Sequence, residues 1–166
     1  MKLNIIVATC ETQGIGYQNK LPWKFSKDME YFSRITKGNH NNAVIMGRKT
    51  HESIGKNLPD RYNIVLSKSN HKNSENLSFF NNIEDIMTFC IEKNFEQVWV
   101  IGGQSIYKQF LGLNLIDEVY ITEIMKFYTC DTFFPTLSIN FSLVESSAEM
   151  ENDTKLYFKK YIKKDI

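Results

Sequence analysis

The chain has 166 residues, of which 42% are hydrophobic and 23% are charged, and its formal net charge at pH 7 is +1. This length is typical of one globular domain with a sizeable core, and a nearly neutral chain lacks the basic surface of proteins whose primary ligand is nucleic acid or an anionic membrane. No apolar run approaches the ~20 residues that a membrane-spanning helix requires.

The first 125 residues alternate between short apolar runs and helical patterns. Continuous β-branched runs predict buried strands at residues 3–9, 43–46, 63–67 and 98–101, and shorter or alternating runs predict strands at 77–80 and 118–124. Apolar residues at helical spacing predict helices at 27–36, 51–54, 83–91 and 105–111. Strands that alternate with helices are typical of a parallel sheet.

The end of the chain changes character. Residues 142–150 and 155–162 predict two strands that flank a turn at 151–153. The pairs Lys159-Lys160 and Lys163-Lys164 favour a solvated edge strand over a binding patch. We therefore predict a single α/β domain over residues 1–166, with a mostly parallel central sheet, helices on both faces and a C-terminal antiparallel hairpin.

The cysteines and histidines do not indicate a metal site. Cys10, Cys90 and Cys130 follow no ligand spacing, and the three histidines are not clustered. The pattern favours reduced structural thiols. The apolar run at residues 2–8 is too short for a secretory signal, so we expect a cytoplasmic protein without a metal.

The stretch from Gly14 to Asp28 carries the first sign of function. A loop with two glycines leads into the apolar corner Leu21-Pro22-Trp23, and Ser26 is the predicted N-cap of the next helix. Asp28 shares a helix face with apolar residues at i+4 and i+7, where a carboxylate needs a partner. That partner is either a ligand or the helix dipole, which commonly accounts for an acid in a first turn.

Two predicted strand-to-helix corners are suited to anions. In Gly47-Arg48-Lys49-Thr50, two cations stand at a helix start, and in Gly102-Gly103-Gln104-Ser105 two glycines permit close approach of a bound group. Each corner alone is more often a tight turn. Together, at the carboxyl ends of strands, they favour an extended phosphate-bearing ligand such as a dinucleotide.

The sequence resembles the dihydrofolate reductase family along essentially its whole length. Besides Ile15-Gly16, Leu21-Pro22-Trp23, Asp28 and Phe32, the shared motifs are Val44-Ile45-Met46-Gly47-Arg48-Lys49-Thr50, Glu52-Ser53-Ile54, Leu58-Pro59, Arg61-Tyr62-Asn63-Ile64-Val65-Leu66-Ser67, Ile101-Gly102-Gly103, Ile106-Tyr107 and Asp131-Thr132-Phe133-Phe134-Pro135. They occur in the family's order and spacing. The resemblance implies reduction of 7,8-dihydrofolate to tetrahydrofolate by NADPH, in support of one-carbon metabolism and thymidylate synthesis.

The resemblance assigns a substrate pocket. Asp28 is expected to hold the pterin with support from Thr122, Arg61 is expected to pair with the glutamate α-carboxylate, and Leu21 and Trp23 are expected beside the reacting rings. The remaining substrate contacts expected from the resemblance are Ile6, Val7, Ala8, Met29, Phe32, Thr50, Ile54 and Leu58. It also implies antifolate inhibitors as ligands and a monomer.

The resemblance assigns NADPH to the two corners and to a mobile loop at residues 14–19. The expected cofactor contacts are Ala8, Ile15, Gly16, Asn19, Gly47, Arg48, Lys49, Thr50, Leu66, Ser67, Lys68, Ile101, Gly102, Gly103, Gln104, Ser105, Ile106 and Tyr107. A cis peptide at Gly102-Gly103 is also implied.

The sequence departs from the family at two positions. His51 stands where Trp is common, and Asp60 stands where Gly is usual before Arg61. We expect altered helix packing at the first and a changed loop shape at the second. One alternative is the related pyrimidine reductase of riboflavin synthesis, against which Leu21-Pro22-Trp23, Asp28 and Arg61 argue. Another is a nucleotide-binding module without catalysis, against which the pair Asp28 and Thr122 argues.

Overall fold

The computed structural model describes residues 1–69 and 71–164. Within them, one eight-stranded sheet has the order β5-β4-β3-β6-β1-β7-β10-β9, and β2 and β8 form a small second sheet. The strands are β1 (Lys2–Thr9), β2 (Gly14–Gly16), β3 (Ala43–Gly47), β4 (Tyr62–Leu66), β5 (Leu77–Phe80), β6 (Gln97–Gly102), β7 (Glu118–Ile124), β8 (Thr132–Phe133), β9 (Phe141–Glu151) and β10 (Thr154–Lys163). The helices are α1 (Ser26–Lys37), α2 (Arg48–Ile54), α3 (Ile83–Lys93) and α4 (Gln104–Gly112).

The sheet is parallel except at its C-terminal hairpin. β1 pairs in parallel with β6 and β7, and β3 and β4 continue the parallel pairing toward β5. β10 pairs antiparallel with both β7 and β9. The carboxyl ends of the parallel strands therefore share one edge, and the predicted fold class is confirmed.

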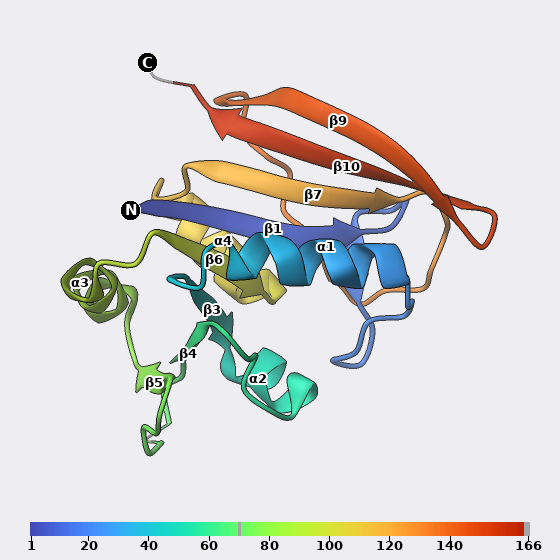
Figure 1. Ribbon diagram of the computed structural model, residues 1–166. Helices are drawn as coiled ribbons and strands as arrows, with labels where there is room; N and C mark the ends of the chain where they lie inside the picture. The colour runs from blue at the N-terminus through green and yellow to red at the C-terminus, as the bar shows by residue number, and fades with distance from the viewer. Residues whose placement is uncertain (70, 165–166) are drawn as a thin grey trace.

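Helices cover both faces of the sheet (Figure 1). On one face, partly buried residues of α1 and α2 pack against Ile6, Val44 and Met46. On the other face, α3 and α4 pack against a cluster that includes Ile5 and Ile45. Neighbouring residues of one strand thus supply the two cores, because side chains alternate across a sheet.

The pair Lys159-Lys160 does not mark an edge strand, and that prediction is wrong. β10 lies between β7 and β9, so β9 is the edge strand. The Lys159 ammonium lies 2.6 Å from Glu123, and the Lys160 ammonium lies 3.8 Å from the buried Glu118. An interior strand can carry these lysines because acidic residues on the neighbouring strand β7 form ion pairs with them.

Two further local predictions are corrected. The second helix starts at Arg48, three residues before the predicted start at His51, so the cations of the corner belong to its first turn. Ile91, predicted to face the core from α3, is 66% exposed, whereas Ile86 and Cys90 on the same helix are fully buried. The sequence pattern also missed β2 and β8, because strands of three and two residues carry no periodicity.

Candidate active site

The carboxylate predicted to bind substrate lies between α1 and β7. Asp28 stands in the first turn of α1, and Thr122, only 1% exposed, lies in β7 opposite Ala8 of β1. Burial raises the pKa of Asp28 above its ordinary value; a hydrogen bond from the Thr122 hydroxyl lowers this pKa, and the charge of Glu151 raises it further. The fold thus brings together the two residues that were predicted to act together.

The start of α1 is held by a side chain of the C-terminal hairpin. The backbone N–H groups of Ser26 and Lys27 donate to Glu151 Oε2 and Oε1, each at 2.8 Å. Phe25 occupies the N-cap position, so the predicted Ser26 cap is wrong. One carboxylate satisfies two free amides and adds a charge that favours the helix dipole. Sequence reasoning missed Glu151 because its partners lie more than a hundred residues away.

An apolar wall lies on the α1 face of the sheet. Ile6 of β1 is 4% exposed and packs in one cluster with Phe32 of α1, Ile54 of α2 and Leu58. All four were predicted to line the substrate pocket. The structure brings them together on the side of the sheet that carries Asp28.

Two other expected pocket residues lie differently. Val7 faces away from Ile6, and its side chain packs in the cluster beneath α4. Only the backbone of Val7 is therefore available on the pocket side. Met29 follows Asp28 on α1 but is 53% exposed, so it adds little to the buried wall.

Arg61 is fixed before any ligand arrives. Its Nε donates to the Pro59 carbonyl at 2.8 Å, and its Nη1 donates to the Thr36 hydroxyl at 2.9 Å. The residue is 7% exposed, and burial lowers the pKa of its guanidinium, while Asp60 raises it. A guanidinium has five N–H donors, so donors remain for a bidentate bond to a carboxylate.

The departure at Asp60 has a structural reason. Its φ of 64° lies in the left-handed region, which favours glycine and tolerates aspartate. The carboxylate lies 3.7 Å from the Lys37 ammonium, which pins it against α1. The loop keeps the conformation that a glycine permits, so the expected change of loop shape is not needed to accommodate Asp60.

The two predicted anion corners lie side by side. Met46 of β3 is paired in register with Gly102 of β6. A Cβ on Gly47 would lie 3.1 Å from Ile106, and one on Gly103 would lie 3.8 Å from Thr50 Oγ1. The N-caps of both helices make no side-chain hydrogen bond to the first turn, so helix amides face a common edge.

The end of β4 adds polar residues to this edge. Leu66 pairs in register with Gly47, which places Ser67 and Lys68 next to the strand that leads into Arg48. Arg48 Nη1 donates to Glu52 at 2.8 Å across one helical turn, and both side chains are exposed. Lys49 and Lys68 are exposed, and Ser67 is 7% exposed.

Some expected cofactor contacts instead support the corner from behind. The buried Tyr107 hydroxyl donates to the Ile6 carbonyl at 3.0 Å, and Ile106 is 6% exposed. Gln104 Oε1 accepts the Phe133 N–H at 2.8 Å, while Ser105 is exposed. Ile15 and Ile101 pack against the two core clusters. The Gly102-Gly103 peptide is cis, as the resemblance implied.

Contacts with Asp131 and with Ser53 of α2 hold the segment at residues 14–19. The Gln18 N–H donates to Asp131 Oδ2 at 3.0 Å, and the Asp131 N–H donates to the Gly16 carbonyl at 2.9 Å. At the next residue, the Ser53 hydroxyl donates to the Asn19 carbonyl at 2.8 Å. Asp131 was noted in a motif, but its contact with this loop is visible only in the fold.

The corner Leu21-Pro22-Trp23 splits between surface and core. Leu21 is 60% exposed, and Trp23 is 8% exposed with its ring centroid 5.3 Å from that of Tyr128. Trp23 packs in a cluster with Cys10 and Phe158. It therefore fixes the chain entering α1, whereas Leu21 is free to contact a ligand.

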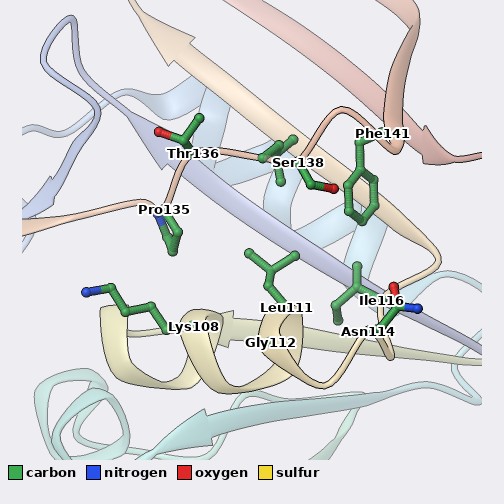
Figure 2. A pocket seen from close by; sticks show the side chains of 10 residues that line it. Lys108, Leu111, Gly112, Asn114, Ile116, Pro135, Thr136, Ser138 and Phe141 are labelled. Carbon is green, nitrogen blue, oxygen red and sulfur yellow. The ribbon is translucent and has the colours of Figure 1, made fainter.

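The cavity in Figure 2 lies away from these residues. It has a volume of about 270 Å³ and is lined by Leu111 of α4, Ile116, Pro135 and Phe141, among others. Because α4 starts at the carboxyl end of β6, its last turn lies at the opposite edge of the sheet. The cavity is thus separate from the edge that carries Asp28 and the two corners.

Comparisons with known proteins agree with this geometry. A sequence model described as Dihydrofolate reductase matches residues 2–163. The chain belongs to the dihydrofolate reductase family. It is 36% identical to a dihydrofolate reductase of Drosophila melanogaster, with 96% of each chain covered. Dihydrofolate reductases of Staphylococcus haemolyticus and Buchnera aphidicola are 37% and 39% identical, over 84% and 82% of this chain and 80% and 79% of theirs.

Membership of the dihydrofolate reductase family gives the reaction. The protein is an oxidoreductase that reduces 7,8-dihydrofolate to 5,6,7,8-tetrahydrofolate, and the family works with a nicotinamide cofactor. Within the described residues, no helix is long and apolar enough to cross a membrane.

Proposed function

We propose that the protein is an NADPH-dependent dihydrofolate reductase in which Asp28 and Thr122 bind the pterin. One observation carries the proposal: the carboxylate with a raised pKa lies on the sheet edge where the two glycine corners also meet. Open α/β sheets bind ligands at this edge. The substrate and cofactor sites therefore adjoin.

The residues present fit a dinucleotide. Gly47 and Gly103 leave a cradle that a side chain would fill, and the first-turn amides of α2 and α4 have no side-chain cap. When bound, the cofactor supplies the hydride that is added to C6 of the pterin. The chain holds its phosphates through these amides, with the Thr50 hydroxyl of the first corner next to Gly103 of the second.

The preference for NADPH over NADH is assigned to Arg48, Ser67 and Lys68. The register of β3 and β4 supports this assignment, because it places these side chains together beside the corner. A 2′-phosphate matches their charge and donors. Arg48→Ala should lower the ratio of kcat/KM with NADPH to that with NADH, while Lys72→Ala, which removes an exposed cation four residues after Lys68, should not. Equal efficiency of the parent with both cofactors would contradict the assignment.

Asp28 and Arg61 bind opposite ends of the dihydrofolate molecule. The Asp28 carboxylate accepts from the 2-amino group and ring N–H of the pterin, and its charge favours protonation at N5. Ile6, Phe32 and Leu58 exclude water from the ring and the aminobenzoyl group. Arg61 pairs with the α-carboxylate of the glutamate through the donors that Pro59 and Thr36 leave free.

The proposal includes the cellular setting. Residues 1–166 act as one cytoplasmic, monomeric domain that supplies tetrahydrofolate for one-carbon metabolism and thymidylate synthesis, and antifolate inhibitors compete at Asp28. Sedimentation equilibrium tests the monomer. The activity itself is tested by following NADPH absorbance with dihydrofolate or with the pyrimidine intermediate of riboflavin synthesis. Oxidation with the second substrate alone would favour the related pyrimidine reductase, and oxidation with neither would favour a binding module.

A further inference from the structure

The fold joins two cysteines that stand far apart in the sequence. Cys10 follows the carboxyl end of β1, Cys130 precedes β8, and their Sγ atoms lie 3.9 Å apart. Cys10 is 4% exposed, and Cys130 is partly exposed. The third cysteine, Cys90 of α3, is fully buried in the core. All three cysteines are free thiols, as expected, but Cys10 and Cys130 lie next to each other.

From this geometry, we infer that Cys10 and Cys130 form a reversible disulfide when a peroxide is present, and that this bond slows turnover. The disulfide is a modification site outside the substrate and cofactor sites. Its formation depends only on the two thiols, whereas its effect on turnover rests on the proposed function and on the expected contact of residues 14–19 with the cofactor.

The two thiols have different surroundings. Cys10 Sγ lies 3.3 Å from the Thr12 hydroxyl. Although burial raises its pKa, hydrogen bonds with Thr12, Gly14 and Cys130 lower it below the ordinary value. The pKa of Cys130 is raised, first by burial and then by Cys10. Cys10 is thus the better thiolate, and Cys130 is the partner that attacks second.

The oxidation balances with hydrogen peroxide as the oxidant. The Cys10 thiolate attacks one peroxide oxygen, so an S–O bond forms, the O–O bond breaks and hydroxide leaves as water after taking a proton. The Cys130 thiol then attacks the Cys10 sulfenic sulfur, so an S–S bond forms, the S–O bond breaks and the thiol proton leaves with the hydroxyl as a second water. Two thiols are oxidised, and one peroxide is reduced to two waters.

The bond lies at the base of the segment that crosses the site. A Cβ on Gly14 would lie 2.3 Å from Cys130 Sγ and 3.1 Å from Cys10 Sγ, so the β2 backbone is in contact with both sulfurs. Cys130 is bonded directly to Asp131, which holds Gly16 and Gln18. Bringing the sulfurs from 3.9 Å to the ~2 Å of a disulfide therefore displaces the anchor of this segment.

The experiment compares the parent with two serine variants. Each full-length protein is treated with equimolar hydrogen peroxide and analysed by intact mass and by peptide mapping after alkylation. The parent and Cys90→Ser should lose two hydrogen atoms and yield a Cys10–Cys130 cross-linked peptide. Turnover of dihydrofolate should fall on the order of tenfold and return with dithiothreitol. Cys130→Ser, which changes the more exposed thiol, should show neither the cross-link nor the reversible fall.

Three results would overturn the inference. Recovery of Cys10 and Cys130 as alkylated thiols from the treated parent would show that there is no modification site. A cross-link that leaves turnover unchanged removes the effect on the segment at residues 14–19. A reversible loss of turnover in Cys130→Ser assigns the effect to another group. Failure of the untreated protein to reduce dihydrofolate would instead refute the proposed function, while the cross-link is still read by mass.

Discussion

Replacing Asp28 with asparagine separates the charge of this side chain from its shape. The amide keeps the size and the hydrogen bonding next to Thr122 but cannot serve as a counter-charge for a protonated pterin. A positioned acid or base contributes ~10²–10⁴-fold to a rate, which is ~2.7–5.4 kcal/mol of barrier. We expect Asp28→Asn to slow hydride transfer at neutral pH by a factor in this range, with partial recovery in acid, where the substrate arrives already protonated.

The same change should have little effect on stability. Loss of a first-turn acid costs ~0.3–1 kcal/mol through the helix dipole. The substitution also removes a charge that is partly shielded from water, as the raised pKa of Asp28 shows. Loss of this desolvation cost increases the free energy of unfolding and so opposes the loss of the dipole interaction. Because the pKa of Asp28 is higher in the folded protein than in the unfolded protein, Asp28 contributes its full stabilisation below the unfolded-state pKa. This contribution to the free energy of unfolding is lost as the pH rises through the folded-state pKa. The Asp28→Asn variant should lack this loss, and its cofactor binding should be unchanged.

The assay is single-turnover hydride transfer against pH, with urea unfolding at two pH values. Glu30→Gln is a matched control, because it removes an exposed carboxylate from the same end of α1. The control should keep the parent rate and pH profile. If Asp28→Asn also kept them, the acid would have only its role at the helix end, and the proposed pterin contact would be refuted.

Three further variants test the contacts around the site. Arg61→Ala should raise the KM for dihydrofolate in steady-state kinetics by a factor that corresponds to ~2–5 kcal/mol, the cost of truncating one partner of a buried charge pair. A pterin that lacks the glutamyl tail should show no such rise. An equal rise with that pterin would mean that Arg61 has another role. Glu151→Gln should lower the pKa of Asp28 and shift the pH profile of hydride transfer toward acid, because the Glu151 charge raises that pKa; an unmoved profile contradicts the coupling. Gly14→Ala should lower the free energy of unfolding by ~1–3 kcal/mol in urea titrations, because its Cβ would meet Cys130 Sγ at 2.3 Å. If the Gly14→Ala variant has the same free energy of unfolding as the parent, the Cys130 side chain moves away from the added Cβ without a loss of stability.

The regular elements were predictable because each carries a local pattern. The runs at 43–46 and 98–101 are apolar and β-branched without interruption, and the structure places them as adjacent central strands. The two glycine corners were also predictable, since each directly follows such a run. That the two corners lie side by side is visible only in the fold, where Met46 is paired in register with Gly102.

The side chains that hold the site in place are not indicated by any pattern in the neighbouring sequence. Glu151 and Asp131 both accept hydrogen bonds from backbone N–H groups, and any residue type supplies such a donor. No pattern around Ser26 or Gln18 therefore points to the acid that holds it. The β9–β10 turn lies at the same end of the sheet as the start of α1 (Figure 1), and only that topology makes Glu151 its cap. Because Glu151 also raises the pKa of Asp28, the C-terminal hairpin both holds the start of α1 and contributes a charge to the surroundings of the Asp28 carboxylate.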